Sequence, residues 1–229
     1  MKKLKICGVI IPSDYQRIYD YLEWEATSPK KVTDFLKEAG QEEVILEISS
    51  PGGSAYAGLE IYSILKAYSG RVVIQVMGLA ASAASVIMCA GAEVQISPVA
   101  QIMIHRAHTY ADGDANALEK TAADLDKLDQ ALCNAYILKT GMEKAALMSM
   151  MDKTTWINAE DAVQMHFADK VMFESENGLP MVAAAPGTFL LNRSQVEKIS
   201  KIIDENTRQE ATDIKLLEQK LSYLVKRGA

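Results

Sequence analysis

Short apolar runs that alternate with helical patterns are the feature that most constrains how this chain can fold. Residues 6–11, 44–48 and 72–77 are rich in Val, Ile and Leu, and the segments between them place apolar residues three and four positions apart. Strands that are apolar along their length are typical of parallel sheets covered by helices. The order of the segments therefore predicts an α/β fold built around a parallel sheet.

Capping residues support the helices in this pattern. Ser28 and Pro29 suit the first turn of a helix that ends at Gly40, because serine caps free N–H groups and proline has none to lose. Gly141 is expected to end a long helix over residues 116–139. The other expected elements are a helix ending at Gly70, an Ala/Ser-rich helix after Gly78, strands over 94–97, 102–105 and 170–173, and helices over 143–151 and 159–166.

The end of the chain differs in composition from the rest. We expect a globular domain over residues 1–174, a Gly-, Pro- and Ala-rich linker over 175–190 and a helical tail over 191–229. The tail repeats apolar residues at helical spacing, which favours a short coiled coil or a partner-docking helix; an ordinary surface helix is the alternative. The clearest repeat consists of Ile214, Leu217, Leu221 and Leu224.

Charge and cysteine content exclude several classes of protein. The 229 residues carry 24 Lys and Arg against 30 Asp and Glu, a net charge of −6, and no basic block suits a nucleic-acid partner. The three cysteines lack disulfide-framework or zinc-ligand spacing. The start of the chain lacks the pattern of a secretion signal. We therefore expect a cytoplasmic protein that binds no metal and no nucleic acid.

One uncharged segment, residues 72–92, has the length of a membrane span. Its composition changes at Gly78 from β-branched residues to alanine and serine. This change favours a buried strand, a turn and a helix over a membrane helix. No membrane association is expected.

The sequence SSPGGS at residues 49–54 follows a predicted buried strand and precedes a helix. Paired glycines allow positive φ angles and bring backbone N–H groups close to a ligand, so the loop can hold an anion or half of an oxyanion hole. An ordinary strand-to-helix turn uses the same residues. The loop is not a nucleotide phosphate loop, because no lysine follows it.

Ser82 lies in the sequence GLAASAAS at residues 78–85, where a strand is expected to turn into a helix. The free N–H groups at the start of a helix stabilise negative charge, which makes Ser82 a candidate nucleophile. A helix-capping serine or a small packing residue is the simpler interpretation of this motif alone.

A nucleophilic serine requires a base, and the chain has only three histidines. His105 ends a predicted strand, where a parallel sheet presents its functional side chains. His108 lies in a polar loop and His166 in a late helix. His105 is therefore the candidate base, with a structural histidine as the alternative.

Taken together, these motifs resemble the ClpP family of serine peptidases. SPGGS, then GLAAS, then IMIH occur in one order, followed by Thr140-Gly141, the segment WINAEDA at 156–162 and DKV at 169–171. The resemblance covers roughly residues 44–171. It is greatest to the phage and prophage branch, the head-maturation proteases, because of the short start, the Ser28-Pro29 helix and the sequence GDA at 113–115.

The resemblance implies a crotonase-like α/β fold, serine peptidase activity without a metal or cofactor, and homo-oligomeric rings, with heptamers or stacked rings possible. Carried over by position, Ser82 is the nucleophile and His105 the general base. The backbone N–H groups of Gly52 and Ala83 form the oxyanion hole, and Ser85 is only a helix residue.

The third residue of the triad departs from the family pattern. The family acid stands two residues before the aromatic residue that corresponds to Trp156, and this chain has Thr154 there. Asp152 is the nearest carboxylate and is our expected orienting group for His105. The alternatives are Thr154, or a backbone carbonyl, with a Ser-His pair that works at lower rate.

Two further departures from the family pattern concern cleavage preference, ring stacking and dependence on an ATPase. After His105 the family has Gln-Pro and a glycine-rich strand, whereas this chain has RAHTYA at residues 106–111, so cleavage preference and ring stacking stay open. A long N-terminal segment of the kind that contacts an unfoldase is not expected, which makes dependence on a Clp ATPase doubtful.

The leading interpretation is an ATP-independent serine endopeptidase that cleaves phage capsid or scaffold protein. One alternative is crotonase-type acyl-CoA chemistry, in which acidic side chains would replace Ser82 and His105. The other is a weakly active or idle ring that serves as an assembly factor, favoured by the missing acid at Thr154.

Overall fold

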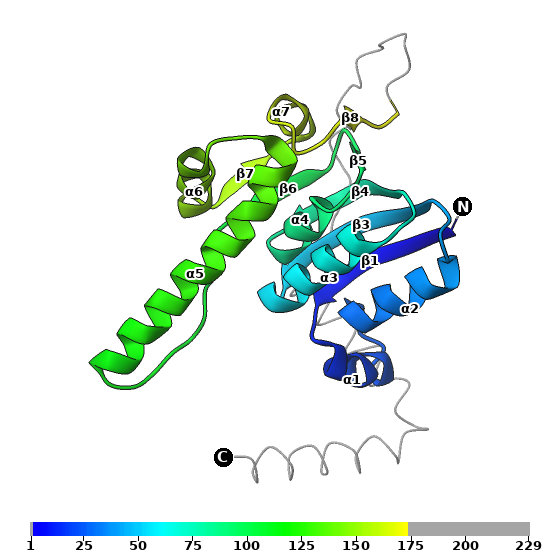
Figure 1. Ribbon diagram of the computed structural model, residues 1–229. Coiled ribbons are helices and arrows are strands. Elements are labelled where there is room, and N and C mark those ends of the chain that lie inside the picture. Colours follow the sequence, from blue (N-terminus) through cyan, green and yellow to red (C-terminus); the bar gives the residue numbers. More distant parts are fainter. Residues whose placement is uncertain (1, 174–229) are drawn as a thin grey trace, which may run out of the picture. The chain divides into compact units, whose positions relative to one another are not determined.

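A computed structural model describes residues 2–173 of the chain (Figure 1). The predicted linker over 175–190 and the helical tail over 191–229 lie outside the described residues. The strands are β1 (Lys2–Ile10), β2 (Ala26–Thr27), β3 (Val44–Gly53), β4 (Val72–Ala81), β5 (Glu93–Ile96), β6 (Gln101–Ile104), β7 (Thr155–Ile157) and β8 (Lys170–Val171). The α-helices are α1 (Gln16–Tyr21), α2 (Pro29–Ala39), α3 (Ala55–Ala67), α4 (Ala83–Met88), α5 (Ala115–Thr140), α6 (Lys144–Asp152) and α7 (Ala159–Gln164).

The sheet is parallel along its main path, which runs in the order β2-β1-β3-β4-β5-β8. The predicted α/β fold with a parallel sheet is therefore confirmed. Strand β4 has two partners in succession, because its first half pairs with β5 and its last residues pair with β6. Strand β7 then adds to β6 in the antiparallel sense. This arrangement brings β6 and β7 beside the carboxyl end of β4.

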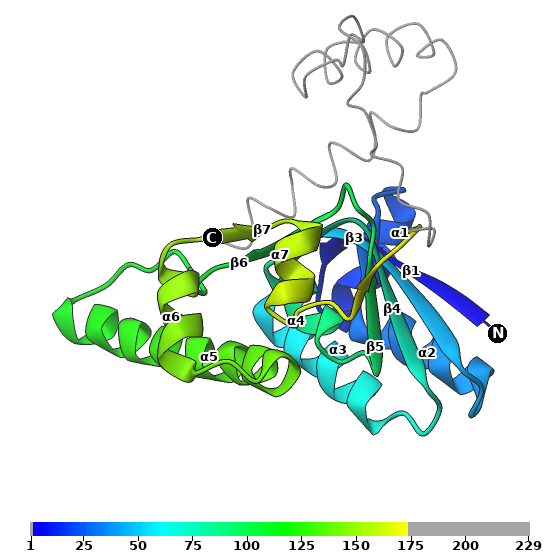
Figure 2. The same cartoon turned by 90° about the horizontal axis from the view of Figure 1, so that it is seen from above.

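The hydrophobic core lies between the sheet and the helices α2, α3 and α4, which are grouped on one side of the sheet (Figure 2). Inward-facing residues of β3 and β4 such as Leu46, Ile48 and Ile74 are fully buried, and Ile61 of α3 and Ile87 of α4 pack in the same cluster. The uncharged segment 72–92 contains a strand and a helix, as predicted, but β4 continues past Gly78 to Ala81 and α4 begins at Ala83. Across residues 2–173, no helix combines the length and the apolar character needed to span a membrane.

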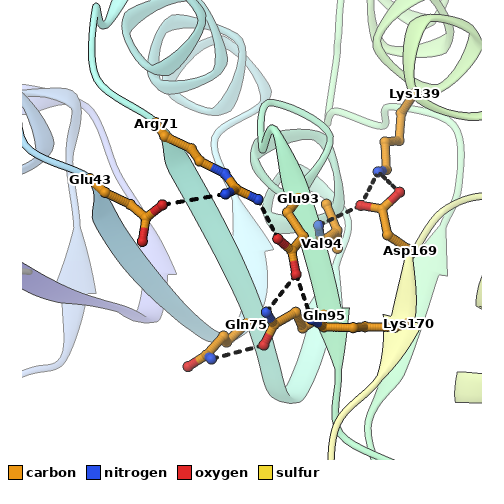
Figure 3. A network of polar contacts seen from close by, with 9 residues as sticks. All are labelled: Glu43, Arg71, Gln75, Glu93, Val94, Gln95, Lys139, Asp169 and Lys170. Atoms are coloured by element: carbon orange, nitrogen blue, oxygen red, sulfur yellow. Dashed lines mark hydrogen bonds and ion pairs between the residues drawn. The ribbon is translucent and has the colours of Figure 1, made fainter.

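Polar side chains link the β5–β8 edge of the sheet to helix α5 (Figure 3). Asp169, just before β8, accepts the backbone N–H of Val94 at 2.6 Å and the ammonium of Lys139 at 2.8 Å. Lys139 lies near the end of α5, and its side chain is 9% exposed. The carboxylate therefore joins α5, β5 and β8, and it holds in place the helix that lines the candidate site described below.

A second group in Figure 3 centres on Glu93 of β5, which pairs with Arg71 and, at 2.8 Å, with Lys170. The Lys170 hydrogen bond and a bond from Gln95 lower the pKa of Glu93. Gln95 in turn accepts a hydrogen bond of 3.0 Å from Gln75 on β4. The face of the sheet at these positions is thus polar, in contrast to the apolar face under α3 and α4.

Helix α1 and strand β7 are among the short elements that have no counterpart in the sequence-based prediction. Helix α1 has only six residues, all partly or fully exposed, and no side chain caps its start. Strand β7 has only three residues. Both elements depend on tertiary packing more than on local sequence signals, because helices and strands of this length have little stability on their own.

Candidate active site

Ser82 occupies the turn between β4 and α4 with an unusual backbone conformation, φ 55° and ψ −125°. Positive φ is disfavoured for a serine, and such strain is found where the surrounding structure fixes the residue. Here the Ser82 N–H donates to the carbonyl oxygen of Met103 on β6 at 2.9 Å. The turn therefore directs the hydroxyl outward from the carboxyl end of the sheet.

His105 directly follows β6, which pairs with the end of β4. Its Nε2 atom lies 2.8 Å from the Ser82 hydroxyl oxygen. For residues 2–173, this is the only hydrogen bond that the His105 ring makes. A neutral imidazole with the acceptor at Nε2 can take the hydroxyl proton and so increase the nucleophilicity of the serine.

The protonation of His105 is set by burial and by two neighbours. Partial burial lowers the pKa of the imidazole, and His108, whose ring centre lies 5.4 Å away, lowers it further. The negative charge of Asp129 acts in the opposite direction. The net effect is a lowered pKa, so His105 is neutral and able to accept a proton near pH 7.

Ser85 has a different environment from Ser82. It is fully buried, and its hydroxyl donates to the Ser82 carbonyl oxygen at 2.7 Å while lying 2.8 Å from the Tyr136 hydroxyl. Burial raises the pKa of Tyr136, which therefore stays protonated. Ser85 thus ties the Ser82 turn to helix α5, and it has no access to a substrate.

The glycine loop packs directly against Ser82. A Cβ atom added to Gly52 would lie 2.7 Å from the Ser82 Cβ and 2.9 Å from the Ala83 nitrogen, so only glycine allows this approach. The Gly52 N–H donates to the Ser50 hydroxyl at 3.1 Å. Gly53 lines the adjoining cavity, and sequence reasoning did not single it out. The loop and the start of α4 thus lie directly against the Ser82 turn.

A cavity of about 400 Å³ adjoins Ser82 and His105. Its apolar lining comes from α4 and the inner side of α5, and polar groups of α5 and of the loop after His105 also border it. The principal apolar residues are Val86, Leu125, Leu128 and Leu132. A cavity of this size and lining accommodates an apolar side chain together with adjoining backbone.

The sequence-predicted acid, Asp152, lies at the end of α6 and pairs with Arg106. Its side chain is 52% exposed, and it makes no hydrogen bond to His105 in the structure. Thr155 of β7 pairs with Ile104 of β6, so Thr154 and His105 each adjoin the last pair of this antiparallel ladder. The position that carries the acid in the family pattern holds this threonine, which lies in a turn with φ 52°.

A buried carboxylate that sequence reasoning missed lies on α5. Asp129 is 2% exposed and accepts the Ala107 N–H at 2.7 Å. A signal for it was present in the sequence, because Asp129 is four residues after Leu125 and three before Leu132, both on the inner side of the helix. A charged residue in such a stripe is a candidate for a functional role.

Comparison with known proteins gives a consistent result. Residues 27–175 match the family model described as Clp protease. The ATP-dependent Clp protease proteolytic subunit of Bacteroides fragilis is 33% identical over 135 residues, which are 58% of this chain and 65% of that protein. The subunit of the same name from Dehalococcoides mccartyi is 31% identical over 143 residues, 62% of this chain and 72% of that protein. The chain thus spans slightly less than two thirds of the Bacteroides relative.

Proposed function

The chain belongs to the Clp protease family, and we propose that it is an ATP-independent serine endopeptidase with Ser82 as nucleophile and His105 as general base. The observation that carries the proposal is the 2.8 Å contact between the Ser82 hydroxyl and His105 Nε2, beside a cavity of about 400 Å³. The strained turn at Ser82 and the lowered pKa of His105 support it, because both suit a nucleophile and base that work near neutral pH.

In the proposed reaction the Ser82 oxygen attacks the scissile carbonyl carbon while its proton moves to His105 Nε2. The tetrahedral intermediate collapses as His105 returns this proton to the leaving amine, which breaks the peptide bond and leaves an acyl-serine. Water, deprotonated by His105, then attacks the ester and releases the carboxylic acid product. Ser82 and His105 end in their starting states, and no metal or cofactor takes part.

The oxyanion of this intermediate requires preorganised donors. We assign this role to the Ala83 N–H at the start of α4 together with an N–H of the glycine loop. The sequence-based assignment for the second donor is Gly52, whose N–H donates to the Ser50 hydroxyl at 3.1 Å and would exchange this acceptor for the oxyanion. The short distance between Gly52 and the Ser82 turn supports a single oxyanion site formed by the glycine loop and the start of α4. Loss of one such donor typically lowers the rate by about 10²–10³-fold.

We further propose that the chain forms a homo-oligomeric ring that encloses its sites. Large apolar side chains on α5 support an interface there, because Leu138 is 74% exposed and Leu118 45% exposed in the single chain. Sedimentation velocity tests this point, and a stable monomer at micromolar concentration would contradict it.

The natural substrate that we propose is a phage capsid or scaffold protein. The support for it is the resemblance of the sequence to the head-maturation branch, in particular the Ser28-Pro29 helix and the sequence GDA at 113–115. Incubation with the capsid and scaffold proteins encoded beside this chain, without ATP and without an unfoldase, should give defined fragments. Fragments that form only when a Clp ATPase is added would contradict ATP independence.

Labelling with a fluorophosphonate probe tests the chemistry directly. Wild-type protein should be labelled at one residue, and Ser82→Ala should lose the label while keeping its oligomeric state. An acyl-CoA enzyme or an idle ring gives no Ser82-dependent label, so absence of labelling in the wild type would reject the peptidase proposal.

A further inference from the structure

We propose that Asp129 is the residue that positions His105 and stabilises its protonated form, in the role that the family pattern gives to an acid at the position of Thr154. The inference rests on the proposed function, in which His105 is the general base. Asp129 does not touch the reacting atoms, so it is a positioning residue that acts through His105.

The geometry of Asp129 fixes the segment that carries His105. One carboxylate oxygen accepts the Ala107 N–H at 2.7 Å, and the other lies 3.2 Å from the Arg106 guanidinium. These two residues follow His105 directly, where β6 has ended and the sheet no longer holds the backbone. The carboxylate therefore anchors the base through its own chain, from a residue of α5 that is 2% exposed.

The charge of Asp129 also acts on the imidazole. His105 gains a positive charge when it takes the Ser82 proton, and a fixed negative charge in a partly dehydrated site stabilises that state. Asp129 opposes the effects of burial and of His108 on the pKa of His105. The other titratable or charged residues around this segment are Asp124 and Tyr136, which line the same cavity, and Arg106 with its partners Asp126 and Asp152.

The alternatives fit this role less well. Thr154 is exposed and has no charge to offer. Asp152 is half exposed and pairs with Arg106, so solvent and the guanidinium both weaken its field at His105. Asp129 also pairs with Arg106, but it is buried, and a buried charge is screened less by solvent.

Proton titration of His105 tests the inference independently of catalysis. The full chain, labelled with ¹³C-histidine, should give three ring signals because it has three histidines; loss of one in His105→Gln assigns it. Asp129→Asn keeps an oxygen that can accept the Ala107 N–H but removes the charge. We expect this variant to lower the pKa of His105 and to slow fluorophosphonate labelling on the order of tenfold.

Asp126→Asn is the matched control, because Asp126 lies on the same helix and contacts the same Arg106, at 3.3 Å, but is largely exposed. It should leave the His105 titration almost unchanged. A shift in Asp129→Asn no greater than in Asp126→Asn would overturn the inference, and so would a larger shift in Asp152→Asn.

A second variant covers the case in which Asp129→Asn does not fold. Arg106→Gln removes the cation that partly neutralises Asp129, and it should raise the pKa of His105. An unchanged pKa in Arg106→Gln would equally overturn the inference. Failure of the proposed function has a separate signature, since wild-type protein would then show no label at Ser82 while the titration of His105 could still be measured.

Discussion

His105 Nε2 and the Ser82 hydroxyl oxygen lie 2.8 Å apart although 23 positions separate the two residues in the chain. The contact follows from the sheet, because Ala81 at the end of β4 is the register partner of Met103 in β6. Each functional residue therefore stands just beyond a paired strand, and the pairing fixes their separation. A shift of this register by one residue would move the His105 ring to the other face of the sheet.

The contacts of Ser85 predict that Ser85→Ala keeps the active-site chemistry but loses stability. The substitution leaves the buried Tyr136 hydroxyl without its partner, which typically costs about 1–3 kcal/mol. Chemical denaturation should therefore show a lower free energy of unfolding, while Ser82 remains labelled by fluorophosphonate. Ser63→Ala is the control, because Ser63 makes a similar 2.9 Å bond to the Leu59 carbonyl on an exposed helix face; its free energy of unfolding should stay within about 0.5 kcal/mol.

A label that persists in Ser82→Ala and disappears in a folded Ser85→Ala variant would mean that Ser85, and not Ser82, is the nucleophile.

The lowered pKa of His105 predicts the pH dependence of activity. Only the neutral imidazole accepts the serine proton, so the rate should rise with pH through the pKa of His105, with a midpoint below the ordinary histidine value of 6.5. His108→Gln removes one cause of the lowering and should move this midpoint upward. The measurement is kcat/KM for a fluorogenic peptide from pH 4.5 to 8.5. A midpoint above 6.5 in the wild type would contradict the environment described for His105.

The register of β6 and β7 predicts that Thr154→Asp increases activity. Thr154 has φ 52°, which is costly for a β-branched residue and better tolerated by aspartate. Residue 154 and His105 each adjoin the last β6–β7 pair, Ile104 with Thr155, so the new carboxylate should favour the protonated form of His105 and raise kcat by about tenfold. Asparagine has nearly the same shape as aspartate and tolerates the same φ but carries no charge, so Thr154→Asn is the matched control. Equal kcat values for the two variants would show that a carboxylate at this position does not act on His105.

Sequence patterns predicted most of the fold because the signals were local. Strands β3 and β4 are continuous apolar runs, and the capping residues Ser28 and Gly40 lie where the pattern placed them. The pairing of Ser82 with His105 was a hypothesis from motif order, and the register that brings the two together is a property of the three-dimensional sheet.

The carboxylate that acts on His105 could not be predicted from local signals alone. Asp129 lies within an apolar stripe on α5, and its contact with Ala107 joins residues 22 positions apart. Whether Asp152 or Thr154 faces the histidine depends on the pairing of β7, a strand of three residues with almost no local signal. Asp152 as the orienting acid stays a prediction, and the titration of His105 compares it directly with Asp129.

The division of the chain predicts that the site works without the C-terminal tail. All candidate site residues lie between Gly52 and Asp152, and residues 1–178 form a compact unit by themselves. A chain that ends at Gly178 should therefore fold, react with fluorophosphonate at the wild-type rate and cleave small unfolded peptides.

The apolar repeat that begins at Ile214 is short for an independent helix in water, so we expect it to become stable on a partner or a second copy. The truncated chain should accordingly lose affinity for its protein substrate or form weaker oligomers in sedimentation experiments. If it stays folded and oligomeric but no longer reacts with the probe, the tail contributes to the active site and this division of roles is wrong.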